Sequence, residues 1–260
     1  MIITSAKSDR IKEIKKLAKS SSYRREKGVY IVEGIRMFRE IPNDSISEVY
    51  VAEGAYDKLK SDILSKISEE KIIFVADHIF ASMSETNTPQ GVLVLVKISE
   101  KTLKNIDISQ RSFILIAEHL QDPGNLGTII RTAEGAGVTG IVLSDDCVDL
   151  YNPKVIRSTM GSIFRVPVYV SQDLVGDINW LKSRGVCIFG AHLDGKEFYD
   201  EDYSKSCGFL IGNEGNGLSN EVSATADKLI KIPMCGKVES LNAATSAAVI
   251  AYEVMRQRRA

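Results

Sequence analysis

The chain has 260 residues, of which 44% are hydrophobic and 26% charged, and its formal net charge is −1. These values are typical of a soluble globular protein with one or two domains, and they argue against a disordered chain. No apolar run approaches the roughly 18 residues that a membrane span needs, and the polar start of the chain does not resemble a secretion signal. A cytoplasmic protein without membrane attachment is therefore predicted.

Cysteine and histidine spacing gives no indication of a metal site. The cysteines form no CxxC pair and, without a secretion signal, are expected to be reduced thiols. The histidines are also scattered and lack the spacing of zinc ligands, so no bound metal is predicted. These residues are Cys147, Cys187, Cys207 and Cys235, together with His78, His119 and His192.

The beginning of the chain is basic although the whole is nearly neutral. Residues 1–30 contain nine basic and three acidic side chains. Such a cluster is typical of a face that binds a polyanion such as RNA. The same pattern also fits a solvated helix face, and charge alone does not separate the two interpretations.

Residues 1–98 are predicted to form a small α/β domain. An apolar stripe at helical spacing begins it, at Ile11, Ile14, Leu17 and Ala18. Strand-like and helix-like segments then alternate, which is typical of helices packed on a sheet. The expected strands cover residues 29–34, 46–51, 71–76 and 91–98. The expected helices pass through Arg36 and cover residues 56–68 and 78–83.

Residues 99–111 are polar and are predicted to be a linker, and residues 112–260 form a second α/β domain. The strands of the second domain are almost continuously apolar, which indicates a parallel sheet covered on both faces. They are expected at residues 113–120, 139–146, 166–171, 187–193, 207–212 and 228–234. Helices are expected at residues 126–137, 152–164, 173–185 and 241–260.

A first polar segment, DPGNLGTIIR, follows the strand expected at residues 113–120. Ligands of open parallel sheets bind at the carboxyl ends of strands, so this segment is well placed for a site. Asn125 fits either a helix N-cap or a site residue. Arg131 interrupts an apolar stretch, and its guanidinium fits either a clamp on an RNA phosphate or an internal salt bridge.

The glycines at 135, 137 and 140 spell GxGxxG, the dinucleotide-binding fingerprint. That fingerprint functions where it follows a strand and opens a helix. Here it closes a helix and precedes a strand, so it is interpreted as a helix C-cap and turn.

A second polar segment, IGNEGNGLS, follows the strand expected at residues 207–212. Gly212, Gly215 and Gly217 make a loop directly after this strand, but the lysine-threonine ending of a nucleotide-binding P-loop is missing. Glu214 lies between these glycines at a strand end, and this setting favours a site role over a solvated carboxylate.

The third segment, IPMCGKVESLNAATSAA, leads into the last helix. Ser240 and Asn242 stand at its start, where capping is the alternative to a site role. Alanines at 244, 247, 248 and 251 then form a small-residue stripe, which indicates either an internal packing face or a subunit interface.

Together the three segments resemble, in order and spacing, the signature motifs of the SpoU/TrmH family of RNA ribose 2′-O-methyltransferases in the SPOUT class. The resemblance covers roughly residues 112–258, and only the tail RQRRA diverges. The first domain is similar to the ribosomal-protein-like substrate-binding domain of some members, including the stretch SETNTPQG.

The resemblance implies a sheet whose C-terminal part forms a trefoil knot, a homodimer formed through the knotted domain, and S-adenosylmethionine as the cofactor. The implied cofactor-binding positions are Leu210, Gly212, Ile232, Met234, Leu241 and Ala244. The implied catalytic positions are Asn125, Arg131, Glu214, Ser240 and Asn242. The implied substrate is RNA, with 23S ribosomal RNA favoured over transfer RNA by the separate first domain.

The expected reaction requires a proton acceptor, because a ribose 2′-OH is a weak acid. A free guanidinium is a poor acceptor, since its pKa exceeds about 12. We therefore expect Arg131 to grip the adjacent phosphate, while that phosphate or Glu214 assists proton removal. The competing functions are a catalytically silent RNA-binding protein and a nucleotide-dependent α/β enzyme; binding of S-adenosylmethionine distinguishes the first from a methyltransferase.

Overall fold

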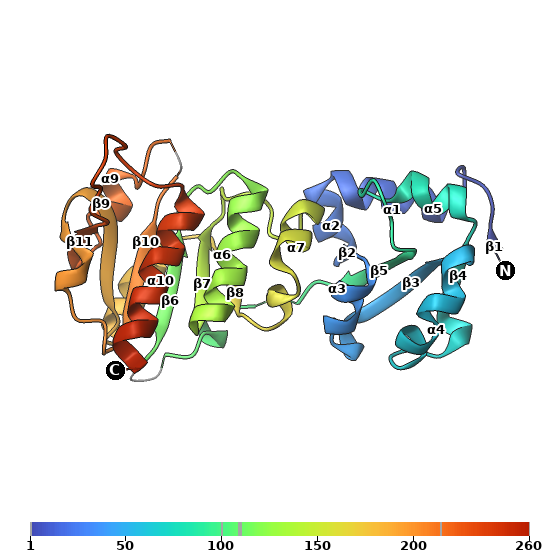
Figure 1. Ribbon diagram of the computed structural model, residues 1–260, viewed down its shortest axis with the longest axis horizontal. Helices are drawn as coiled ribbons and strands as arrows, with labels where there is room; N and C mark the ends of the chain where they lie inside the picture. The colour runs from blue at the N-terminus through green and yellow to red at the C-terminus, as the bar shows by residue number, and fades with distance from the viewer. Residues whose placement is uncertain (1, 100, 109–110, 214, 260) are drawn as a thin grey trace. The chain divides into compact units, whose positions relative to one another are not determined.

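The computed structural model describes residues 2–99, 101–108, 111–213 and 215–259. These residues form two compact units, which are described separately (Figure 1). The first unit combines residues 1–100 with residues 149–164. The second unit combines residues 101–148 with residues 165–260.

The first unit is built on a mixed sheet in the order β1-β4-β3-β5-β2. β4 runs parallel to β1 and β3, whereas β5 is antiparallel to β3 and β2. The strands are β1 (Ile2–Ile3), β2 (Val29–Glu33), β3 (Ile46–Ala52), β4 (Ile72–Val75) and β5 (Val92–Lys97). All four strands predicted for this part of the sequence are present; β1 was not predicted, because two residues carry no periodic signal.

The helices of the first unit are α1 (Asp9–Lys19), α2 (Ser21–Lys27), α3 (Ile35–Glu40), α4 (Tyr56–Leu64), α5 (Asp77–Met83) and α7 (Pro153–Thr159). Short 3-10 helices are η1 (Asn43–Ser45), η2 (Glu53–Ala55), η3 (Glu69–Lys71) and η5 (Ser162–Phe164). The predicted stripe of α1 is buried in the core through Ile11, Ile14 and Leu17. The polar helix α2 was not predicted; Gly28 ends it with a left-handed φ of 65°.

The second unit is built on a fully parallel sheet in the order β11-β9-β10-β6-β7-β8, as the apolar strands predicted. The strands are β6 (Phe113–Ala117), β7 (Gly140–Ser144), β8 (Val168–Ser171), β9 (Cys187–Glu197), β10 (Cys207–Ile211) and β11 (Lys228–Lys231). The chain builds β6, β7 and β8 outward, then crosses to β9 and returns to insert β10 beside β6. This reversal of strand order is where parallel sheets bind ligands.

Helices cover both faces of this sheet. They are α6 (Pro123–Ala136), α8 (Leu174–Ser183), α9 (Asn220–Ser223) and α10 (Ala243–Arg259), with the 3-10 helices η4 (Leu103–Asn105) and η6 (Phe198–Asp200). α6 and α10 pack side by side (Figure 1). Arg258 of α10 lies over the ring of Phe113, whereas Ile178 of α8 packs against Ile114. Because neighbouring residues of a strand point to opposite faces, α10 and α8 cover different sides.

The glycine fingerprint has the structure predicted for it. Gly137 ends α6 in the left-handed conformation with a φ of 77°, and Gly140 begins β7. The fingerprint is a helix C-cap and a turn, so it offers no nucleotide site.

Two parts of the chain differ from the expectations. The segment expected as a linker is packed, because Leu103 and Ile106 are buried against the core of the second unit. The helix expected at residues 152–164 is split into α7 and η5 by Met160 and Gly161, both with positive φ. No described helix is long and apolar enough to cross a membrane.

Candidate active site

A cavity of about 440 Å³ lies at the carboxyl ends of β9, β10 and β11. It collects side chains and backbone from the second and third polar segments and from β9. Its lining residues are Ala191, His192, Leu193, Asp194, Ile211, Gly212, Asn213, Gly215, Asn216, Gly217, Leu218, Ile230, Lys231, Ile232, Met234, Glu239, Ser240, Leu241, Ala243 and Ser246. Its volume falls within the range of about 300–1,000 Å³ typical of small-molecule sites.

One wall of the cavity is a stretch of β9 where its pairing with β11 is interrupted. β11 pairs with β9 at Phe189 and Gly190 and again at Lys196 and Glu197, so residues 191–195 leave the ladder between the two stretches. A Cβ on Gly195 would lie 2.4–2.6 Å from the backbone of Ile230, so only glycine permits this close crossing.

This wall brings His192 and Asp194 to the cavity, which the sequence reasoning missed. The available signal was the polar AHLDG stretch, whose histidine, aspartate and glycine interrupt an otherwise apolar strand pattern.

The opposite wall is the tight loop after β10. A Cβ on Gly212 would lie 2.2 Å from the carbonyl carbon of Gly217 and 2.3 Å from the amide nitrogen of Leu218. Asn213 and Gly217 also exchange two backbone hydrogen bonds, of 2.9 and 3.0 Å. Glycine at 212 is thus required by packing.

The predicted cofactor residues are distributed between the cavity and the surrounding core. Gly212, Ile232, Met234 and Leu241 line the cavity. Leu210 is fully buried in β10 and packs in the core, and Ala244 is buried in the first turn of α10. These two lie beside lining residues, Ile211 and Ala243, and do not line the cavity themselves.

The first and third polar segments meet through a pair of asparagines. The side-chain amide nitrogen of Asn242 donates to Oδ1 of Asn125 at 3.0 Å. Asn242 also begins α10, because its Oδ1 accepts from the backbone N–H of Ala244 at 2.9 Å. Asn125 is not the cap of α6; that role belongs to Asp122, whose Oδ1 accepts from the N–H of Asn125 at 2.8 Å.

The remaining predicted catalytic residues have different settings. Ser240 lines the cavity directly before Leu241. Arg131 is exposed on α6, and its guanidinium pairs with no other residue within the described part of the chain. The internal salt bridge considered for Arg131 is therefore not observed there. Glu214 lies outside the described residues.

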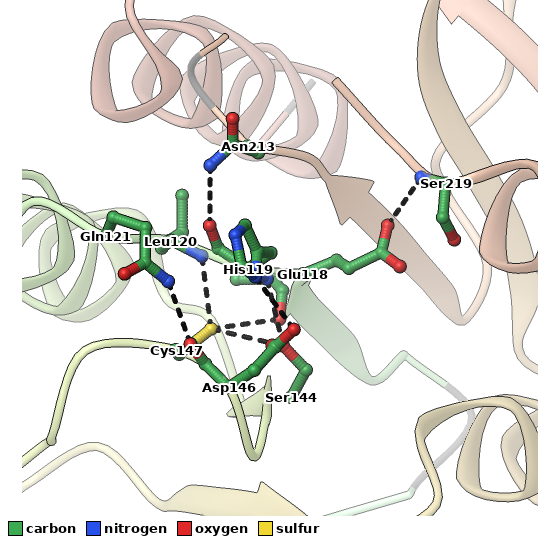
Figure 2. A network of polar contacts seen from close by, with 10 residues as sticks. Glu118, His119, Leu120, Gln121, Ser144, Asp146, Cys147, Asn213 and Ser219 are labelled. Atoms are coloured by element: carbon green, nitrogen blue, oxygen red, sulfur yellow. Dashed lines mark hydrogen bonds and ion pairs between the residues drawn. The ribbon is translucent and has the colours of Figure 1, made fainter. Parts of the chain in front are cut away.

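A polar network surrounds the end of β6 next to this site (Figure 2). His119 has a φ of 53°, its N–H donates to Ser144 Oγ at 2.9 Å, and its Nδ1 lies 2.8 Å from Asp146 Oδ2. Partial burial acts to raise the pKa of Asp146, but hydrogen bonds from Ser144 and His119 outweigh it and lower that pKa below its usual value.

The site lacks the donor set of a metal centre, because the described residues contain no group of three or more His, Cys, Asp or Glu side chains able to hold an ion. The chemistry that it supports is the binding of a polar small molecule against backbone groups, beside amide and hydroxyl side chains.

Comparison with known proteins identifies the family to which each part of the chain is similar. Residues 112–252 match the SpoU rRNA methylase family, and residues 8–94 match an MRM3-like substrate binding domain. The chain is 31% identical over 255 residues to the 23S rRNA (guanosine(2553)-2'-O)-methyltransferase RlmP of Bacillus subtilis (strain 168), covering 97% of this chain and 98% of that protein. It is 30% identical over 217 residues to the 23S rRNA (uridine(2479)-2'-O)-methyltransferase of Streptomyces viridochromogenes, covering 81% and 75%.

Solved structures agree over almost the whole chain. The SpoU methyltransferase AviRb from Streptomyces viridochromogenes, in complex with its cofactor AdoMet, superposes with a TM-score of 0.89 at 26% identity, covering 98% of this chain and 99% of that one. An AdoMet-bound rRNA methyltransferase from Sinorhizobium meliloti gives a TM-score of 0.87 at 27% identity, covering 98% and 97%. The chain belongs to the SpoU rRNA methylase family.

Proposed function

We propose that this protein transfers a methyl group from S-adenosylmethionine to a ribose 2′-OH of 23S ribosomal RNA. One observation supports this most: the cavity is lined by the second and third signature segments, and the Asn125–Asn242 hydrogen bond joins it to the first. The relatives named as 23S rRNA 2'-O-methyltransferases support the choice of RNA.

The cavity suits the cofactor in size and in chemistry. Its volume of about 440 Å³ is that of a small-molecule site, and the close approach at Gly212 presents backbone donors and acceptors to a ligand. Gly212, Ile232, Met234 and Leu241 are the residues we expect to hold it. When bound, S-adenosylmethionine supplies an electrophilic methyl group on a sulfonium.

The protein then has to position the ribose and accept a proton. We place the 2′-OH near Asn125, Ser240 and Asn242, whose amide and hydroxyl groups can orient it. Arg131 grips the neighbouring phosphate through two parallel hydrogen bonds, which fixes the attacking oxygen in line with the methyl group. That phosphate or Glu214 assists removal of the proton, because an arginine does not give up its own proton.

We assign residues 1–98 to RNA binding and residues 112–260 to methyl transfer; residues 99–111, expected as a linker, join the two and pack through Leu103 and Ile106 on the second unit. We also propose that the chain is knotted and forms a homodimer through the knotted domain, with one subunit's arginine serving the other's site. The close crossings at Gly195 and Gly212 support the knot, since glycine is required at both. We also propose that the protein acts in the cytoplasm.

Methyl transfer to purified RNA tests the function. The protein, radiolabelled S-adenosylmethionine and unmodified 23S rRNA should give label in a 2′-O-methyl nucleotide, with little label in transfer RNA. DNA of the same sequence should stay unlabelled, because it lacks the reacting hydroxyl.

Loss of a single 2′-O-methyl mark from 23S rRNA in a deletion strain should identify the nucleotide. A transfer RNA product would favour the alternative substrate. Absence of S-adenosylmethionine binding would instead indicate a silent RNA-binding protein.

A further inference from the structure

The loop that forms one wall of the cavity is fastened at both ends to the end of β6. We call its described residues, Gly212, Asn213 and 215–218, the cofactor loop. At its start, the Asn213 side-chain amide donates to the carbonyl oxygen of His119 at 2.8 Å. Just past its end, Glu118 Oε2 accepts from the backbone N–H of Ser219 at 2.8 Å. Figure 2 shows the two contacts on either side of the β6 end.

Asn213 uses both ends of its amide. While its nitrogen donates to His119, its Oδ1 accepts from the N–H groups of Gly215 at 2.8 Å and Asn216 at 3.0 Å. An aspartate could accept the last two hydrogen bonds but could not donate to a carbonyl. Position 213 therefore requires an amide side chain. With all three of these hydrogen bonds made inside the protein, Asn213 differs from a loop residue whose side chain is only solvated.

The His119 carbonyl, which accepts the hydrogen bond from Asn213, is itself fixed in place. His119 has a φ of 53°, a conformation that side-chain-bearing residues adopt rarely. It is held there by the hydrogen bond from its N–H to Ser144 and by the contact of its ring with Asp146. Such conformations persist only where the surroundings enforce them, and they concentrate at functional sites.

We propose that Asn213 and Glu118 are positioning residues that hold the cofactor loop in the shape that binds S-adenosylmethionine. The inference rests on the proposed function, and it adds two residues outside the predicted catalytic and cofactor sets. The two attachment points on the other side, the His119 carbonyl and the Glu118 carboxylate, directly follow β6, and the chain continues from them into α6 with Asn125. The wall of the cavity and the start of α6 are therefore held by the same short segment.

Equilibrium binding of S-adenosylmethionine to the purified full-length protein, measured by calorimetry without RNA, tests the proposal. Asn213→Asp should raise the Kd on the order of tenfold, because a donor is lost and a carboxylate faces a carbonyl. The expected rise in Kd is limited to this size because the hydrogen bonds of Asn213 are partly exposed to solvent. At saturating cofactor and RNA, kcat should stay within about threefold, since no reacting group changes.

Asn179→Asp is the matched control, because it makes the same charge change on an exposed residue of α8 away from the cavity. Its Kd should equal that of the wild type. Glu118→Ala should weaken binding on the order of tenfold, whereas Glu118→Gln keeps an acceptor for Ser219 and should restore most of the affinity.

The possible outcomes are distinct. If wild-type protein binds the cofactor and Asn213→Asp binds it equally well, the positioning role is wrong. It is also wrong if Asn213→Asp only lowers Tm, or if kcat falls while Kd stays constant, which would point to chemistry by the His119 imidazole. If the wild type binds no S-adenosylmethionine, the proposed function itself fails.

Discussion

Single residues in this protein have roles that depend on partners far away in the sequence. Asn125 and Asn242 are separated by 117 positions, yet their side chains share a hydrogen bond at the site. Arg131 shows the opposite situation, because its exposed guanidinium has no partner among the described residues. Because it forms no ion pair with a described residue, this charge is available for a phosphate.

We predict that Arg131→Lys lowers the rate of methyl transfer by roughly 100-fold, because a lysine cannot make the two parallel hydrogen bonds of a guanidinium. The Kd for S-adenosylmethionine should change less than about twofold. Single-turnover kinetics with labelled cofactor would measure the rate, and Arg184→Lys on the exposed surface is the control. A lysine variant with most of its activity intact would refute bidentate positioning.

The reactivity of the thiols is a second residue-scale prediction. Burial raises the pKa of the Cys207 thiol to about 12, although Arg258 Nη2, 3.2 Å from the sulfur, acts in the opposite direction. Cys235 is exposed. At pH 8, iodoacetamide should modify Cys235 in the folded protein and Cys207 only after unfolding, as peptide mass mapping would show.

The same shift has a consequence for stability. A thiol in the unfolded chain has a pKa of about 8.5, so the raised folded value favours folding fully below that pH. This contribution to the free energy of unfolding is lost as the pH rises from about 8.5 toward 12.

Equal labelling of Cys207 and Cys235 by iodoacetamide in the native protein would contradict the buried, protonated state of the Cys207 thiol.

Among the secondary-structure elements, residues at or near the ends of helices and strands form most of the candidate active site. α10 begins at a residue that both caps the helix and contacts Asn125. β9 opens between two paired stretches, and the residues released there line the cavity. The sequence placed both elements correctly in order, but it extended β11 to residue 234 and ended β9 at residue 193, because local apolar character does not reveal pairing partners.

Two substitutions separate the roles of Asn242. Asn242→Ala should destabilise the protein by about 1 kcal/mol through loss of the cap, lowering Tm by roughly 2–4 °C. Asn242→Ser keeps a capping oxygen and should have nearly wild-type stability. Both remove the amide that donates to Asn125, so both should reduce kcat by about tenfold or more. Thermal unfolding and the methylation assay would check this; full activity of Asn242→Ser would make the asparagine a cap only.

At the scale of the whole molecule, the segment of residues 149–164 belongs to a different unit from its neighbours in sequence. It lies inside the family match over residues 112–252, yet it packs with the N-terminal elements. Arg24 Nε donates to Asp149 Oδ2 at 2.9 Å, and Tyr30 packs on Tyr151 with ring centroids 4.6 Å apart. The chain therefore passes between its units more than once.

Arg24→Ala should destabilise this part of the fold by about 3–5 kcal/mol, since Asp149 would keep a nearly buried, unpaired charge. Amide hydrogen exchange should become faster in residues 149–164 as well as around α2. Asp149→Asn in the Arg24→Ala background should recover part of the loss. Exchange that changes only near residue 24 would show that the pair does not hold the segment.

The amino-acid pattern was sufficient to predict the alternation of strands and helices, the parallel second sheet and the positions of the three polar segments. These are local properties, because periodicity and turn residues act over a few positions. Family membership confirms the α/β class, and it confirms the methyltransferase activity and the cofactor S-adenosylmethionine, which the resemblance of those segments implied. The interpretation of the glycine fingerprint as a helix C-cap and turn was also correct from its local context alone.

Which residues meet could be seen only in the folded chain. It joined Asn125 to Asn242, brought His192 and Asp194 to the cavity, left Leu210 in the core, and assigned residues 149–164 to the N-terminal unit. Each of these depends on contacts between segments far apart in the chain. One sequence records the local preference of each segment, whereas the free energy of burial and pairing across the sheet selects its partner.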